Sequence, residues 1–338
     1  MSWDDIYGHD DAKRLLLAHL ASGEVPGAYL LIGPEGVGKR KLALEMAKAL
    51  NCTAGEGTRS CDACPTCTQM GRGTHPDLHL LLPGGASDQV RIEAVRQLLG
   101  RFALRPFNAA VQVAIIDGAH RLTEEAANAL LKALEEPSRR ARFLLTTSRL
   151  ADCLPTIVSR CQLLRCGPLP ADVVARFLID LHGCDPRTAE AASRISAGSV
   201  SRALELAGRW DTYQRTLTRL GAESLQAEWL EHGLPETRQE LALFLEDMTA
   251  WLRDVALIAS GALEQVRETG RADALRAQAD TVDVDRCVDT AFELMSLRES
   301  LEQFVSPRLV AALAREKWLS LMGVRPQLGH LPTAELGV

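Results

Sequence analysis

A glycine-rich loop constrains the fold of this chain more than any other feature. Residues 33–39 (GPEGVGK) match the pattern G-x-x-x-x-G-K, in which backbone N–H groups cradle phosphates and the lysine neutralises their charge. The apolar run 28–32 predicts a strand that leads into this loop, and the apolar residues after the loop recur at helical spacing. A strand, a phosphate loop and a helix in this order predict an α/β domain, with a parallel sheet and helices on both faces.

Two positions of the predicted nucleotide site carry residues that are unsuited to ATP hydrolysis. The pattern requires Ser or Thr after Lys39 as a Mg²⁺ ligand, but this chain has Arg40, and a guanidinium has no lone pair for a metal. The buried strand predicted at 111–116 ends in Asp117, a suitable Mg²⁺ ligand, but Gly118 replaces the water-polarising Glu that usually follows. We therefore predict a degenerate nucleotide site without catalysis, whose binding of ATP stays open, at Gly33, Gly36, Gly38, Lys39 and Asp117.

Three further segments fit the same α/β domain. Thr123 is a suitable N-cap for a helix that ends before Pro137. The apolar run 142–147 predicts another buried strand, and the run 161–164 predicts a short final strand. The segment 167–170 (GPLP) then predicts a hinge.

The pattern changes from α/β to helical at this hinge. We predict an α/β domain at 1–166, a short helical region at 167–207, a longer helical domain at 208–325 and a flexible tail at 326–338. The longer domain is either a bundle that packs only on itself or a collar that joins subunits. Its clearest helical face consists of Leu241, Phe244, Leu245, Met248, Trp251, Leu252 and Val255.

Four cysteines form the pattern C-x₈-C-x₂-C-x₂-C in an insert at 52–67. Four thiolates complete the tetrahedron that Zn²⁺ accepts and leave no open position, so we predict a structural zinc site. An iron–sulfur cluster and four free thiols are the alternatives. We interpret His75 and His79 as loop and strand residues rather than ligands. The predicted zinc ligands are Cys52, Cys61, Cys64 and Cys67.

Charge and cysteine content narrow the class of protein and its compartment. A net charge of −6 argues against a protein that grips nucleic acid through a broad basic surface. The sequence shows no N-terminal signal pattern and no apolar stretch of about 18 residues, so we expect a cytoplasmic protein without a membrane partner. Cysteines in that compartment favour metal binding or free thiols over disulfides.

Arg160 lies between a short helix predicted at 155–159 and the last predicted strand. An arginine at such an edge commonly forms a surface salt bridge, but it can also project into the nucleotide of a neighbouring subunit. An arginine finger of this kind accelerates hydrolysis by about 10³–10⁵-fold because it stabilises charge in the transition state. The pattern alone leaves both roles open.

A set of motifs covers roughly residues 1–320, and the most specific are the segment 128–137 and the triplet Ser159-Arg160-Cys161. The full set is 3–9 (WDDIYGH), 33–39, 52–67, 128–137 (NALLKALEEP), 159–161 and 306–309 (SPRL). With these motifs the chain resembles the delta prime subunits of the bacterial DNA polymerase III clamp loader, a family within the AAA+ superfamily.

The resemblance implies an AAA+ module, a small helical lid at 167–207 and a collar at 208–325 that joins subunits into a hetero-oligomeric ring. The ring opens a sliding clamp and places it on primed DNA. The implied partners are therefore the ATPase subunits and the clamp-opening subunit of the clamp loader, and the assembly contacts the clamp and DNA. The resemblance also implies that Arg160 is an arginine finger in trans, and Arg40 and Gly118 indicate a member that does not hydrolyse ATP.

The segment 198–204 (GSVSRAL) looks like the lid motif of this family, with one departure. The ATP-sensing arginine is expected at Ser201, but the chain has Arg202 one position later, which is about 100° around a helix. This departure also favours a member without hydrolysis.

Two other functions stay open. The first is an ATP-hydrolysing motor subunit of the same clamp loader, because Lys39 and Asp117 remain. The second is a binding module in which the cysteine insert contacts nucleic acid or a partner protein. The insert lacks aromatic residues for stacking, and Arg59 is its only positive charge.

Overall fold

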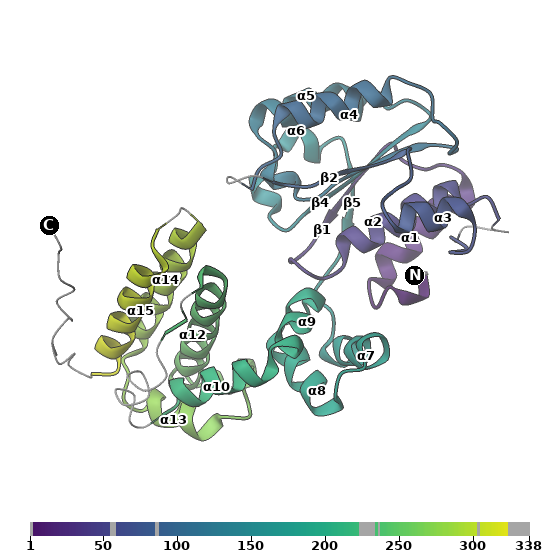
Figure 1. Cartoon of the computed structure of the whole chain (residues 1–338). Coiled ribbons are helices and arrows are strands. Elements are labelled where there is room, and N and C mark those ends of the chain that lie inside the picture. Colours follow the sequence, from purple (N-terminus) through teal and green to yellow (C-terminus); the bar gives the residue numbers. More distant parts are fainter. Residues whose placement is uncertain are drawn as a thin grey trace, which may run out of the picture. The chain divides into compact units, whose positions relative to one another are not determined.

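The computed structural model of the chain forms two compact units, residues 1–207 and 208–338 (Figure 1). The predicted flexible tail at 326–338 lies outside the described residues, and the division into four regions stays a prediction. Within the described part of the chain, no helix has both the length and the apolar composition needed to span a bilayer. The described residues are 3–54, 59–84, 88–222, 234–235, 237–302 and 305–323.

A parallel sheet of five strands forms the centre of the first unit. Its strands lie in the order β2-β3-β4-β1-β5, and every neighbouring pair is parallel. This sheet confirms the α/β prediction, because parallel neighbours need crossover connections such as helices. The strands are β1 Ala28–Ile32, β2 Leu78–Leu81, β3 Gln112–Ile116, β4 Ala141–Thr147 and β5 Gln162–Arg165.

Helices cover both faces of the sheet, and further helices come after its last strand in the sequence. The surrounding helices are α1 Asp10–Ser22, α2 Lys39–Asn51, α3 Pro65–Gly71, α4 Ile92–Phe102, α5 Glu124–Glu135 and α6 Pro155–Val158. Figure 1 shows α4, α5 and α6 over one face of the sheet and α1, α2 and α3 over the other. The following helices are α7 Ala171–His182, α8 Pro186–Ile195 and α9 Val200–Gly208. Short 3₁₀ turns occupy Trp3–Asp5, Ala119–Arg121 and Leu150–Asp152.

The strands bury both faces in two separate apolar cores. Successive strand residues point to opposite faces, so Leu31 packs in the core that contains Met46 of α2, whereas Leu30 packs in the core that contains Leu130 of α5. All four of these side chains are fully buried. Burial on both faces explains why the strands are continuous apolar runs rather than alternating ones.

The predicted elements of the first unit match the structure closely. The runs 28–32, 111–116, 142–147 and 161–164 correspond to β1, β3, β4 and β5. Thr123 caps α5, because its hydroxyl accepts a hydrogen bond from the Ala126 N–H at 3.3 Å. His79 lies in β2 and His75 in the loop before it, as interpreted from the sequence.

Among the described residues of the second unit, the regular elements are helices, and none is a strand. Its helices are α10 Trp210–Leu220, α12 Arg238–Ala259, α13 Ala272–Ala279, α14 Val284–Glu302 and α15 Pro307–Leu321, with a 3₁₀ turn at Leu263–Gln265. The face predicted from Leu241 to Val255 is buried at every position and forms the core side of α12. Trp251 is anchored within it, because its indole N–H donates to Gln278 Oε1 at 2.7 Å.

Candidate functional site

A cavity of about 750 Å³ lies beside the phosphate loop, at the carboxyl edge of the sheet. The loop joins β1 to α2, and it turns through Gly36 and Gly38, whose φ angles of 74° and 103° favour glycine. Residues 35–39 line the cavity together with Asp117, which follows β3. Open parallel sheets bind their ligands at this edge, so the structure brings the predicted nucleotide-site residues together at a suitable place.

Lys39 is folded into the loop itself. Its Nζ donates hydrogen bonds to the carbonyl oxygens of Gly33 and Pro34, both at 2.6 Å. The residue is 8% exposed, and burial lowers the pKa of its ammonium group from the ordinary value. No carboxylate in the described part of the chain forms an ion pair with Lys39.

Arg40 lies beside Asp117, the acid that would bind a metal ion in a phosphate-loop site. Its Nη1 is 3.2 Å from Asp117 Oδ2, and the other carboxylate oxygen, Oδ1, accepts a hydrogen bond from the Thr146 hydroxyl at 2.5 Å. Both oxygens of Asp117 are therefore engaged by protein groups. The Arg40 side chain is 59% exposed, so this is a surface ion pair, and it places a tethered cation beside the carboxylate that holds Mg²⁺ in a typical phosphate-loop site.

Gly118 differs from a water-polarising Glu in conformation as well as in chemistry. Its φ is +73°, and its N–H donates to Thr146 Oγ1 at 3.1 Å. A Cβ at this position would lie 3.2 Å from Cδ of Arg121, in a backbone conformation that L side chains rarely adopt. This backbone does not suit a Glu at position 118.

The helices after the sheet approach the phosphate loop through the predicted lid motif. The Ser201 N–H donates to the Gly36 carbonyl at 3.2 Å, and Ser201 lines the cavity. The backbone N–H of Arg202 instead donates to the Ser199 hydroxyl at 3.3 Å. The position that faces the loop therefore carries a serine, as the departure in the motif predicted.

His9 contacts the phosphate loop, a role that no local pattern marked, although it ends the quoted segment 3–9. It adopts a left-handed φ of 56°, and its Nε2 lies 2.7 Å from the Val37 carbonyl oxygen. Burial lowers the pKa of His9, which favours a neutral ring that donates from Nε2, since a carbonyl can only accept. The residue thus fixes the phosphate loop from the start of α1, a contact across 28 positions.

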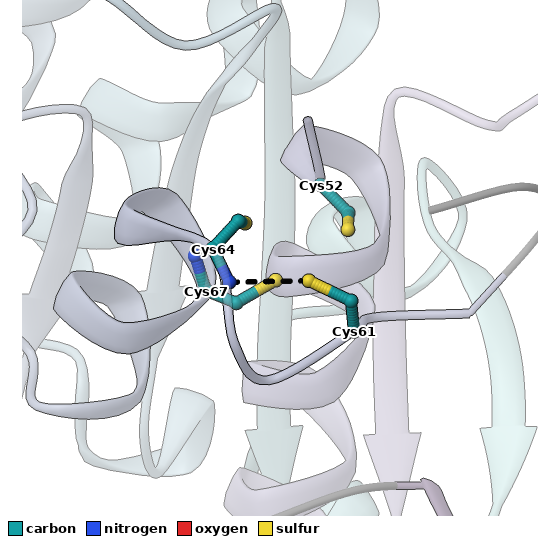
Figure 2. A group of neighbouring side chains, drawn as sticks. All are labelled: Cys52, Cys61, Cys64 and Cys67. Carbon is teal, nitrogen blue, oxygen red and sulfur yellow. Dashed lines mark hydrogen bonds between the residues drawn. The ribbon is translucent and has the colours of Figure 1, made fainter. Parts of the chain in front are cut away.

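The four cysteines of the insert converge on one point (Figure 2). Their sulfur atoms all lie within 4.8 Å of one another. Cys52 caps the end of α2, Cys64 is the N-cap of α3, and Cys67 lies within α3. In a tetrahedral zinc site with Zn–S bonds of about 2.3 Å, the sulfur atoms are about 3.8 Å apart. Small adjustments of the side chains would therefore complete the site.

Local hydrogen bonds favour a thiolate at Cys64, whereas burial raises the pKa of the Cys67 thiol. The Cys64 N–H donates to Cys61 Sγ at 3.2 Å, and the Cys67 N–H donates to Cys64 Sγ at 3.4 Å. Burial opposes ionisation of Cys64, but the N–H groups of Cys67 and Thr53 lower the pKa of its thiol to about 5. A thiolate is the form that binds metals, so the donor set fits a soft or borderline cation.

A buried ion cluster connects the insert to α2. The ammonium of Lys48 lies 2.6 Å from Glu45 Oε1 and also contacts Asp62, which stands between two of the cysteines. Ser60 donates to Glu45 Oε2 at 3.0 Å. Lys48 and Glu45 are each 1% exposed, so this cluster is a buried polar contact that holds the insert against α2. No sequence pattern revealed it.

Arg160 lies at the amino edge of the sheet and is paired within its own chain. Its Nη2 is 3.2 Å from Glu135 Oε2, and its Nη1 donates to the Thr156 carbonyl at 3.1 Å. The arginine side chain is 29% exposed and that of Glu135 is 60% exposed. Its Nε is buried without a hydrogen-bond partner. The salt bridge considered from the sequence is thus present, and part of the guanidinium remains accessible.

Comparison with known proteins gives consistent matches. A family model described as DNA polymerase III, delta subunit, matches residues 8–170. The chain is 31% identical to DNA polymerase III subunit delta′ of Bacillus subtilis over 263 residues, which cover 73% of this chain and 77% of that protein. It is 37% identical to DNA polymerase III subunit delta′ of Pseudomonas aeruginosa over 204 residues, or 59% of this chain and 61% of that protein.

The chain is also similar to a longer protein, DNA polymerase III subunit tau of Salmonella typhimurium. Identity is 32% over 244 residues, which cover 71% of this chain but 37% of tau. The chain therefore spans less than two thirds of tau and of the Pseudomonas aeruginosa protein, but more than two thirds of the Bacillus subtilis protein.

Proposed function

Because this chain belongs to the delta′ family of DNA polymerase III subunits, we propose that it is a clamp-loader subunit that does not hydrolyse ATP itself. Its partners would be the ATPase subunits and the clamp-opening subunit of a hetero-oligomeric ring. The ring would load a sliding clamp on primed DNA. Three features of the described residues support parts of this proposal: the Arg40–Asp117 ion pair, the exposure of Arg160 and the outer face of α14.

The contact between Arg40 and Asp117 carries the proposal. Hydrolysis at a phosphate loop needs Mg²⁺ between the protein and the phosphates, and here a guanidinium 3.2 Å from the acid competes with the metal in the place of the hydroxyl that would help to bind it. Gly118 adds no carboxylate to orient water. We expect the purified chain to show no steady-state ATP turnover above that of a Lys39→Ala variant. Robust turnover that Lys39→Ala abolishes would instead support the ATP-hydrolysing motor subunit.

Arg160 is proposed as an arginine finger for a neighbouring subunit. Its guanidinium is planar, permanently charged and partly exposed, as such a role requires. Glu135 would hold it in an extended position until a nucleotide phosphate competes for it. Because the carboxylate is exposed, this surface ion pair is weak enough to exchange, at about 0–1 kcal/mol.

The test of this role is ATP turnover in a ring reconstituted with this chain. The Arg160→Ala variant should lower turnover at the site it completes by about 10³-fold or more, and Arg160→Lys should recover little, since Lys lacks the planar fork. The exposed Arg139 provides a matched control, and Arg139→Ala should leave turnover unchanged. Unchanged turnover of the Arg160→Ala ring, with normal assembly, would remove the role in trans.

We also propose that the second unit acts as a collar. Helix α14 buries Cys287, Leu294 and Leu301 on its core side. Val288, Phe292 and Met295 recur at i, i+4 and i+7 on a side next to the core side, where they are 40%, 63% and 47% exposed. An apolar stripe outside the core is a suitable contact for a helix of another subunit.

Zinc is the proposed occupant of the cysteine cluster, in a structural role. Four thiolates leave no position for a substrate or water. The buried contact of Lys48 with Asp62 would transmit the fixed shape of the insert to α2, and so to the phosphate loop at the start of that helix.

A further inference from the structure

We infer that the loop between α4 and β3 presents a contact for single-stranded DNA, in which Phe107 stacks on a base while Arg105 and Arg140 hold backbone phosphates. This contact lies outside the phosphate-loop cavity and is separate from Arg160, and neither the family nor the relatives specify it. The inference rests on the proposed function only for the source of the strand, since primed DNA has an unpaired template.

The loop exposes an unusual amount of apolar side chain. Phe107 is the most exposed large apolar side chain among the described residues, at 81%, and Leu104, three positions before it, is 69% exposed. Single apolar residues are common on a protein surface, but two in one short turn indicate a contact. An aromatic ring that projects into water can stack on an unpaired base of any sequence, because every base has a flat π-face.

Three hydrogen bonds fix the backbone beneath the ring. Asp77 is 2% exposed and directly precedes β2. Its carboxylate accepts from the N–H groups of Phe107 at 2.7 Å, Asn108 at 3.0 Å and Ala109 at 2.9 Å. Burial opposes ionisation of Asp77, but these N–H groups hold its pKa below the ordinary value. Because the loop backbone is already ordered, binding of a strand need not bear the entropy cost of ordering it.

Positive charge accompanies the loop. The segments 101–112 and 137–142 contain five arginines and no acidic residue, and the nearest acid in the sequence is Glu136. Arg105 and Arg140 are exposed, and within the described part of the chain neither side chain forms an ion pair. Exposed arginines beside an aromatic ring are typical of a surface that binds the backbone and bases of a single strand.

The sheet brings the two segments together at its amino edge. Gln112 begins β3 and pairs with Ala141 of β4, and its N–H donates to the Arg140 carbonyl at 2.8 Å. The loop that Asp77 holds lies at the start of β2, two strands from β4, so it is about 10 Å from Arg140 at about 4.8 Å per strand. At about 3.4 Å per nucleotide, this span suits about three stacked nucleotides.

The position of this contact is compatible with a role of Arg160 in a neighbouring subunit. β5 lies four strands from β2, or about 19 Å, so a subunit that receives the guanidinium does not have to cover Phe107. A net charge of −6 argues against a broad basic surface but not against a contact of two arginines and one ring. The expected affinity is therefore modest.

Fluorescence anisotropy of a labelled oligothymidine of about 15 nucleotides, titrated with the full chain at about 50 mM salt, tests the inference. The native chain should bind with a Kd of about 1–100 μM. Phe107→Ala should weaken binding about fivefold or more, whereas Phe107→Trp keeps an aromatic face and should retain it. Arg105→Ala and Arg140→Ala should each reduce the slope of log K against log salt by about 0.7.

A matched control is Arg187→Ala, which removes an exposed arginine from α8 and should leave the affinity and the salt slope unchanged. Duplex DNA of the same length should bind more weakly, because its bases are already stacked. The inference is overturned if the native chain binds no single strand, or if Phe107→Ala binds as tightly as the native chain does. The latter result would indicate a surface for polyanions in general, such as an acidic protein. ATP turnover of the purified chain and the ring tests the proposed function separately, so the two failures are distinguishable.

Discussion

Replacement of Lys48 by methionine should destabilise the first unit strongly, because it leaves a buried carboxylate without its counter-ion. Lys48 and Glu45 are each 1% exposed, with 2.6 Å between Nζ and Oε1. Burial already raises the pKa of Glu45, and the methionine offers it no hydrogen bond. Removal of one partner of a buried ion pair costs about 3–5 kcal/mol.

Hydrogen exchange measured by mass spectrometry suits this prediction, because it reports each unit separately. Since about 1.4 kcal/mol corresponds to a factor of ten, protection of the amides in α2 should fall by two to three and a half orders of magnitude. Peptides from α12, in the second compact unit, provide an internal control and should keep their protection.

A matched double variant separates the lost charge from the lost side chain. Glu45→Gln with Lys48→Met removes both fully buried charges and leaves Asp62, which is 23% exposed, without the lysine, so it should cost less than Lys48→Met alone. The reasoning is refuted if Lys48→Met lowers the protection of α2 by less than about threefold, or if the double variant is as damaging as the single one.

Two further predictions concern acid and metal. Burial lowers the pKa values of four histidines in the first unit: His9, His75, His79 and His120. Below about pH 6.5 the unfolded state therefore binds more protons than the folded state, and the first unit should lose stability as the pH falls. A urea midpoint of this unit that is the same at about pH 7.5 and about pH 5.5 would contradict this prediction. The native chain should carry one zinc ion, which Cys64→Ser should remove and Cys184→Ser should retain, as measured by elemental analysis after dialysis. Iron in the native chain would favour the iron–sulfur alternative, and a metal-free native chain would contradict both.

The fold was predictable where burial imposes a simple pattern. β1, β3 and β4 are covered on both faces, so each is a continuous apolar run that the sequence shows directly. β2 is an edge strand of four residues that includes His79, and its outer residues are partly exposed, so its bounds were not predicted. β5, the other edge strand, was predicted although most of its residues are exposed, so edge position alone does not hide a strand from the sequence.

The sequence identified the residues of the candidate site, but it did not identify the contacts between residues that are far apart in the chain. The spacing of the phosphate loop and of the four cysteines specifies their chemistry, because each set binds its ligand from one short segment. The Arg40–Asp117 contact spans 77 positions and the His9–Val37 contact spans 28. Such pairs depend on how the sheet brings distant loops together, and a single sequence carries no local trace of them.

The parallel direction of the strands gives the first unit a polarity with consequences for assembly. Arg160 precedes β5, whereas the cavity follows β1, and these two strands pair in parallel. The five residues of β1 separate the two sites by about 16 Å, so the guanidinium cannot serve the cavity of its own chain. Under the proposed role in trans, Arg160 would reach the nucleotide of another molecule, and the contact would join the amino edge of one sheet to the carboxyl edge of the next. Subunits joined in this way would stack head to tail, and a subunit that does not hydrolyse ATP would be suited to one end of the row.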